Sequence, residues 1–85
     1  MSDLDADFDA AVKAVRTQDA DPGNQVKLRL YALYKQATVG DVPGRRPGFT
    51  DPVGRAKFDA WKGVGGTSPA AAKRAYVELA GDLPQ

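Results

Sequence analysis

Residues 31–41 read YALYKQATVGD, and the interpretation of the whole sequence depends on this stretch. It continues an apolar pattern over residues 23–39 that repeats at the spacing of one helical face. The residues of that face are Val26, Leu30, Leu33 and Ala37. Tyr31, Tyr34 and Lys35 share a different face, because residues three and four apart are neighbours on a helix. They are therefore either partly buried residues at a helix contact, or a surface for a ligand that has both a flat ring and phosphate groups.

The remaining sequence predicts three more helices and no strand. Apolar periodicity and capping residues give four ranges in all: about 3–17, 23–39, 52–63 and 69–81. We predict Ser2 as the first N-cap, Thr50 or Asp51 as the third, and Thr67 or Ser68 as the fourth. A loop of eleven residues, DVPGRRPGFTD, separates the second helix from the third. Four helices in 85 residues predict one all-α domain over residues 1–85, a four-helix bundle.

The composition narrows the range of functions. The chain has no Cys and no His, so it lacks a thiolate nucleophile, the commonest general base and the commonest transition-metal ligand. We therefore expect a protein that is not an enzyme and that carries no metal. No apolar run reaches the roughly 18 residues of a membrane helix, and no signal peptide is visible. These features predict a cytoplasmic protein without membrane insertion, and the glycine content fits a bacterial cytoplasm.

Charge is distributed unevenly along the chain. Residues 1–21 hold six acidic and two basic side chains, a net of −4, whereas residues 27–62 hold eight basic and three acidic side chains, a net of +5. A basic middle can attract phosphate or another polyanion. The alternative is a solvated surface whose charges cluster by chance.

Three other stretches or residue sets carry a weaker sign of function. GVGGTS at 63–68 lacks the strand, the glycine spacing and the lysine of a phosphate loop, and reads better as the end of one helix and the start of the next. The aspartates of DLDADFD at 3–9 lack the glycine and the distal glutamate of a calcium loop, and are typical of a helix N-terminus. Aromatic residues beside basic ones also suit single-stranded nucleic acid. We expect no nucleic acid, because the acidic first helix would repel a long polyanion and a compact phosphorylated ligand fits the charge better.

The blocks that surround the two tyrosines resemble a known family. In chain order they are YALYKQATVGD at 31–41, RPG at 46–48, GRAKFDAW at 54–61, GTS at 66–68 and AY at 75–76. In this order and spacing they are similar to the acyl-CoA-binding protein family, over a stretch from about Phe8 to Leu79.

The resemblance implies a fold and a ligand. The fold is an all-α, four-helix up-down-down-up bundle, and the function is non-covalent binding of medium- and long-chain fatty acyl-CoA esters by a carrier or pool former without a cofactor. The residues that it assigns to the ligand are Arg16, Tyr31, Tyr34, Lys35, Lys57 and Tyr76. The two lysines would neutralise the 3′-phosphate of CoA, and the tyrosines would pack on the adenine and hydrogen-bond the phosphate.

Three positions depart from the family pattern. Phe58 replaces a usual tryptophan, Val53 replaces a basic residue, and Lys27 lies where an apolar residue usually flanks the acyl chain. We expect the protein to be a monomer. The departures at Val53 and Lys27 keep an alternative open, in which a helical interaction module kept the fold, lost the ligand and uses the same groove for a peptide or a partner helix.

Overall fold

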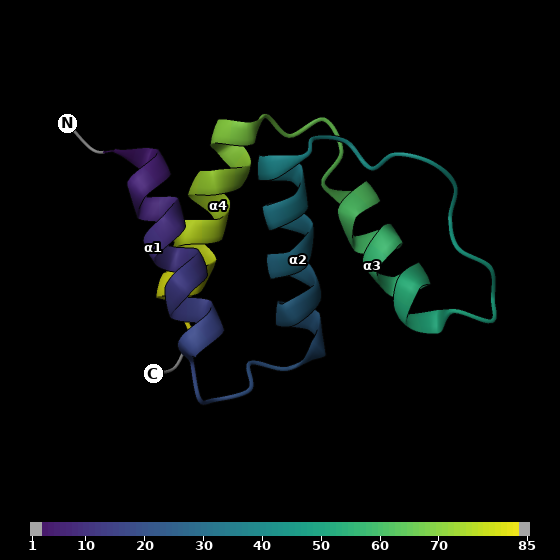
Figure 1. The fold of residues 1–85 in the computed structure, drawn as a ribbon, viewed down its shortest axis with the longest axis horizontal. Coiled ribbons are helices and arrows are strands. Elements are labelled where there is room, and N and C mark those ends of the chain that lie inside the picture. The colour runs from purple at the N-terminus through teal and green to yellow at the C-terminus, as the bar shows by residue number, and fades with distance from the viewer. Residues whose placement is uncertain (1–2, 84–85) are drawn as a thin grey trace.

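The computed structural model describes residues 3–83, and its helices match the predicted ones closely (Figure 1). They are α1 (Leu4–Thr17), α2 (Asn24–Thr38), α3 (Pro52–Gly63) and α4 (Pro69–Gly81). The described part of the chain contains no strand. The all-α prediction is confirmed.

Side chains and one glycine fix the helix ends. Asp51 and Ser68 are the N-caps of α3 and α4, where their side-chain oxygens accept the backbone N–H of the third residue of each helix at 2.9 and 3.1 Å. The predicted cap Ser2 lies outside the described residues, and Asp3 fills that role for α1. At the end of α2, Gly40 has a φ of +103° and donates its N–H to the Lys35 carbonyl oxygen at 3.1 Å, a conformation that favours glycine.

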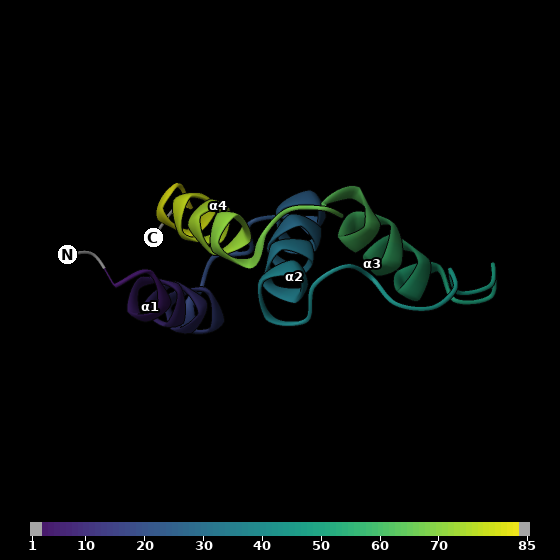
Figure 2. The same ribbon diagram turned by 90° about the horizontal axis from the view of Figure 1, so that it is seen from above.

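The helices form a flat arrangement rather than a closed bundle. The chain measures 43 × 28 × 15 Å along its principal axes, with α1 and α4 together at one end, α2 in the middle and α3 at the other end (Figures 1 and 2). Helices α1 and α4 run in one direction and α2 and α3 in the other (Figure 1), so the predicted up-down-down-up order is confirmed.

The helices differ in how many neighbouring helices they pack against. α4 packs against both α1 and α2, whereas α3 packs against α2 alone. Between the described helices α1 and α2, no pair of Cα atoms lies within 8 Å. The space between these two backbones is therefore left to side chains.

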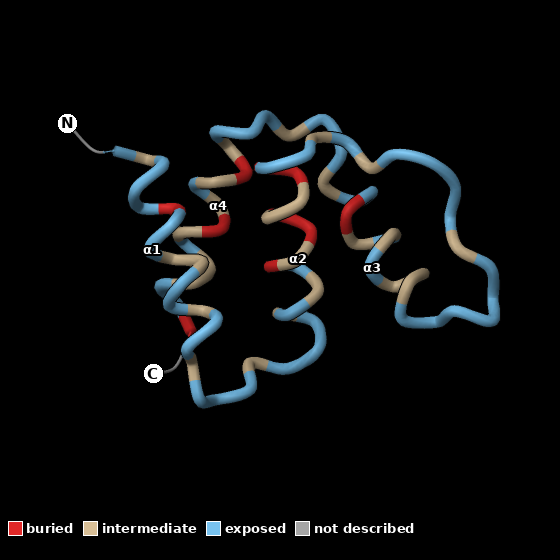
Figure 3. The backbone as a smooth tube through the Cα atoms, in the orientation of Figure 1, coloured by how far each residue is buried: buried red, intermediate tan, exposed pale blue. Residues whose placement is uncertain are grey.

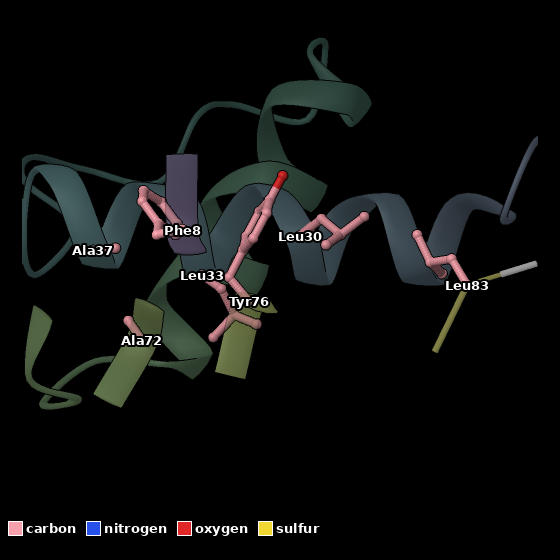
Figure 4. Close-up of a cluster of buried hydrophobic side chains, with 7 residues drawn as sticks. All are labelled: Phe8, Leu30, Leu33, Ala37, Ala72, Tyr76 and Leu83. Carbon is pink, nitrogen blue, oxygen red and sulfur yellow. The ribbon is translucent and has the colours of Figure 1, made fainter. Parts of the chain in front are cut away.

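The core lies where α1, α2 and α4 meet (Figures 3 and 4). Its buried residues are Phe8, Leu30, Leu33, Ala37, Ala72, Tyr76 and Leu83. Two of them, Phe8 and Tyr76, are large enough to span the distance between helices whose backbones stay apart. None of the described helices is long and apolar enough to cross a membrane.

Candidate functional site

Three aromatic rings lie between α1 and α2. The Phe8 ring stacks on Tyr34 with 5.9 Å between centroids, and meets the edge of Tyr76 at 5.2 Å. α4 supplies Tyr76, which is 4% exposed, while Tyr34 is half-buried. The rings therefore hold the two helices together where their backbones do not touch.

A hollow of about 240 Å³ opens beside these rings. It is lined by Val12, Val15, Arg16, Lys27, Leu30, Tyr31, Tyr34 and Tyr76. Four of the six residues predicted for the ligand, one from α1, two from α2 and one from α4, are thus brought to one place. The lining combines valine and leucine side chains with three tyrosines and two cations, as a site for a ligand with an apolar and an anionic part requires.

A second hollow of about 400 Å³ adjoins the first. The two share Val12, Arg16 and Tyr34, and the second also reaches Phe8, Lys13 and Thr38. Ligand pockets in proteins commonly measure about 300–1,000 Å³. Together the two hollows, which meet at Arg16 and Tyr34, provide space of this order.

Lys35 and Lys57 form a separate cluster around Tyr31. Their ammonium nitrogens lie 5.8 and 5.4 Å from the centroid of the Tyr31 ring, within the range of cation–π attraction. Lys35 also lies 5.8 Å from the ring of Trp61. Neither ammonium group forms an ion pair or a hydrogen bond with any described residue. Two unneutralised positive charges therefore converge on a tyrosine that also lines the first hollow.

Trp61 explains how Lys57 reaches α2. Its indole N–H donates to the Gly40 carbonyl oxygen at 2.7 Å, and its ring meets the edge of Tyr31 at 6.4 Å. Lys57 lies one helical turn before Trp61 and so shares its face of α3. When Trp61 packs against α2, Lys57 is carried to the ring of Tyr31.

Tyr76 is the most strongly buried of the predicted site residues. Burial raises the pKa of its phenol above the usual value, the nearby Arg16 charge lowers it, and Tyr34 raises it slightly. The hydroxyl therefore stays protonated at neutral pH and can donate a hydrogen bond. Figure 4 shows the ring inside the core cluster with the hydroxyl pointing away from Leu33.

Lys27 lines the first hollow and a neighbouring one of about 270 Å³. Its ammonium is 3.1 Å from a carboxylate oxygen of Asp21, in the link between α1 and α2. Both side chains are more than half exposed, and the pKa of Asp21 is lowered by the Gly23 N–H and by Lys27. The lysine that replaces an apolar residue thus directs its charge toward the linker, while its stem borders the hollow.

Sequence reasoning missed one buried polar group. Gln36 is 2% exposed, and its amide nitrogen donates to a carboxylate oxygen of Asp41 at 2.8 Å and to the Thr67 carbonyl oxygen at 2.9 Å. The same Asp41 oxygen accepts the Gly66 N–H at 2.9 Å, and these two bonds lower the pKa of Asp41. The network ties the end of α2 to the link before α4, and so positions the tyrosines of both helices. Its partners lie in loops outside α2, so the residues next to Gln36 carried no local signal for this role.

The described structure therefore places all six predicted site residues around the groove between α1 and α2. Arg16, Tyr31, Tyr34 and Tyr76 line the first hollow, and Lys35 and Lys57 flank it through the Tyr31 ring. Phe58 is half-buried and Val53 is exposed on α3.

Known proteins resemble this chain over most of its length. The family model described as acyl-CoA-binding protein matches residues 5–80. Among solved structures, acyl-CoA-binding protein 2 of Oryza sativa superposes with a TM-score of 0.90 at 40% identity, over 94% of this chain and 87% of the other. The protein of the same family from Moniliophthora perniciosa gives a TM-score of 0.84 at 47% identity, over 93% and 76% of the two chains.

Two curated relatives that match this chain are much longer proteins. Enoyl-CoA delta isomerase 2 of Rattus norvegicus is 48% identical over 77 residues, which is 91% of this chain and 20% of the isomerase. Acyl-CoA-binding domain-containing protein 5 of the same species is 45% identical over 75 residues, or 84% and 15% of the two chains. This chain thus spans about a fifth or less of these relatives. The matches in sequence and structure agree: the chain belongs to the acyl-CoA-binding protein family.

Proposed function

We propose that this protein binds medium- and long-chain fatty acyl-CoA esters non-covalently and serves as their carrier or pool former in the cytoplasm. The observation that carries the proposal is the pair of unneutralised lysines, Lys35 and Lys57, over the Tyr31 ring at the edge of an apolar hollow. A ligand with a phosphorylated, aromatic head and an apolar tail would satisfy both halves of this arrangement.

The head group would use the polar residues. Lys35 and Lys57 would neutralise the 3′-phosphate of CoA, and the exposed guanidinium of Arg16 would meet a second phosphate. Tyr31 and Tyr34 offer ring faces to the adenine, and the protonated hydroxyl of Tyr76 offers a hydrogen bond.

The acyl chain would lie along the apolar side chains between α1 and α2. Val12, Val15 and Leu30 supply this surface. Each buried methylene contributes about 0.8 kcal/mol, so shielding ten of them contributes on the order of 8 kcal/mol before ordering costs. The tail would therefore dominate affinity, and the head would select CoA esters over other lipids.

Binding rather than catalysis fits these residues. No His or Cys is present, and the lining of the first hollow offers cations and phenols but no carboxylate that could serve as a general base. The isomerase among the relatives matches this chain over only 20% of its length, so its name does not assign a reaction to the matched part.

Calorimetry tests the proposal. We expect affinity to rise with acyl length from C4 to C18, by at most about fourfold per buried methylene, and free CoA to bind far more weakly. Lys35→Ala and Lys57→Ala should each weaken acyl-CoA binding about tenfold and leave 3′-dephospho-acyl-CoA less affected. Lys62→Ala, an exposed lysine on the same helix as Lys57, is the control.

Two results would count against the proposal. An affinity that does not change with acyl-chain length would exclude burial of the tail. If the lysine variants lost equal affinity for acyl-CoA and for 3′-dephospho-acyl-CoA, the lysines would not contact the 3′-phosphate. Native mass spectrometry of protein purified from cells adds an independent check, because bound acyl-CoA appears as a mass increment. A protein with no increment and no acyl-CoA affinity would favour the alternative, a helical module for protein partners.

A further inference from the structure

The loop between α2 and α3 exposes an aromatic side chain that the ligand groove does not use. Phe49 is 84% exposed, and Val53 in the first turn of α3 is 63% exposed. Neither lines the hollows between α1 and α2. Figure 3 shows this loop as a mostly exposed stretch at the end of the molecule away from α1. A single exposed apolar residue is common on protein surfaces, so a functional role for Phe49 has to be argued from the residues around it.

The backbone around Phe49 is held in place. The Asp51 N–H donates to the Gly48 carbonyl oxygen at 3.0 Å, which closes a turn with Phe49 at its tip. The Asp51 carboxylate also accepts the Gly54 N–H at 2.9 Å and caps α3. A Cβ at position 54 would come within 2.2 Å of that carboxylate, so glycine there permits the close cap. The turn thus presents Phe49 to solvent in a fixed place.

An ion pair also attaches the part of the loop before Phe49 to α3. Arg46 forms two hydrogen bonds with the carboxylate of Asp59, at 2.9 and 2.7 Å. This bidentate pair spans the loop and the middle of α3, and it raises the pKa of Arg46 and lowers that of Asp59. The remaining arginine of the loop, Arg45, is exposed and has no ion pair with any described residue.

The end of the molecule that carries Phe49 is basic. Residues 42–63 hold five basic and two acidic side chains, a net of +3, and both acids are engaged, one as the α3 cap and one with Arg46. Residues 3–21, which form α1 and the link after it, have a net charge of −4. These segments lie toward opposite ends of the long axis (Figure 1). The charge separation would orient the positive end, whose loop carries Phe49, toward an anionic surface.

We propose that Phe49, Val53 and Arg45 form a docking surface for an anionic lipid bilayer. Two apolar side chains are too few for a specific protein interface, which buries about 800 Å² per partner. Interfacial contact with a bilayer needs only a small apolar insertion beside basic groups that attract anionic lipids. Contact of this size is reversible and involves no membrane-spanning helix. The surface is separate from the ligand groove and does not depend on what that groove binds.

Vesicle sedimentation tests the docking surface. The intact protein should partition onto vesicles of phosphatidylcholine mixed with phosphatidylglycerol, and much less onto phosphatidylcholine alone. Phe49→Ala should lower the partition coefficient about tenfold and Arg45→Gln about fivefold. Val39→Ala is the matched control, since Val39 is 59% exposed but lies at the end of α2 outside the loop. Equal losses in the control, or no preference for anionic vesicles, would overturn the proposal.

Fluorescence locates the contact directly. Phe49→Trp should be quenched by brominated lipid beyond the level that Trp61 gives in the parent protein, whereas Val39→Trp should not. If sedimentation equilibrium without lipid shows a dimer that Phe49→Ala abolishes, the occupant is a second copy and the bilayer proposal is wrong. Acyl-CoA calorimetry on the Phe49→Ala protein should give the parent affinity, so failure of docking and failure of ligand binding are distinguished.

Discussion

At the scale of single residues, Lys27 sets the polarity of the groove next to the tyrosines. Its stem borders two hollows while its ammonium is 3.1 Å from Asp21. Exposed ion pairs of this kind contribute about 0–1 kcal/mol to stability, so the pair does little for the fold. Its main consequence is that the stem of a charged side chain, rather than a wholly apolar side chain, borders the proposed path of the acyl chain.

Replacing this lysine should therefore tighten binding of the tail. We expect Lys27→Met to raise the affinity for long-chain acyl-CoA about fivefold and to leave free CoA unchanged, since methionine adds apolar surface without a charge. Calorimetry with both ligands measures the difference, and Arg29→Met, an exposed cation on the same helix, is the control. Weaker binding of free CoA would instead mean that the ammonium contacts the head group.

Tyr76 links the core to the solvent side of the groove, and its pKa gives a pH test. Burial raises that pKa above the unfolded value of about 10, so the folded protein holds the proton more tightly than the unfolded chain does. Stability from this group is fully present below pH 10 and is lost as pH rises through the higher folded pKa.

Tyr76→Phe should therefore reduce the alkaline loss of stability. Urea unfolding at neutral pH and at successive alkaline pH values would show the parent protein losing more stability than the variant above about pH 10. Tyr31→Phe, which leaves Tyr76 in place, should keep the parent's loss. Identical alkaline curves for the parent and the Tyr76→Phe protein would contradict the assignment.

At the scale of elements, α2 is the helix on which both α3 and α4 pack. α3 packs on it alone, α4 packs on it and on α1, and the Gln36 network ties its end to the link before α4. The Gln36 amide donates to both the Thr67 carbonyl oxygen and Asp41, and each would lose a hydrogen-bond donor without it.

Removal of this amide should destabilise the whole fold. We expect Gln36→Ala to cost about 2–3 kcal/mol, because it leaves a cavity at a site that is 2% exposed and removes one hydrogen-bond donor each from the Thr67 carbonyl oxygen and Asp41. Urea unfolding at neutral pH measures the loss, and Gln25→Ala, at an exposed position on the same helix, should change stability little. A comparably small loss at position 36 would show that water replaces the amide.

Local sequence signals were sufficient to predict the helices. Asp51, Ser68 and Gly40 act through their own backbone neighbours, so their roles could be read from nearby residues. Gln36 could not be recognised in this way, because its partners Asp41 and Thr67 lie in loops whose paths depend on tertiary packing. The convergence of Lys57 on Tyr31 likewise depends on how Trp61 docks, and only the family resemblance suggested it beforehand.

At the scale of the whole molecule, the separation of α1 from α2 is the feature that periodicity could not predict. A periodic apolar face indicates that a helix is buried, but not which neighbour covers it. The short link between these helices favours adjacent backbones, yet aromatic side chains and hollows occupy the space between them. The topology itself followed from the family resemblance.

A ligand in this groove should bridge the two helices and stabilise the fold. Palmitoyl-CoA at a hundred times its Kd should add about 2.7 kcal/mol, which for a domain of this size raises Tm by roughly 10–20 °C. Differential scanning calorimetry with and without ligand measures the shift, and free CoA at the same concentration is the control. An unchanged Tm at saturation would place the ligand outside the native groove.

The thin contact between α1 and α2 also bears on how long the empty protein survives among proteases. A helix that is held by one neighbouring backbone and a few rings opens more readily than one packed on two sides. Proteolysis follows the population of such open states when opening is fast. Unoccupied molecules would thus be degraded first, and the number of molecules would follow the supply of the lipid that fills them.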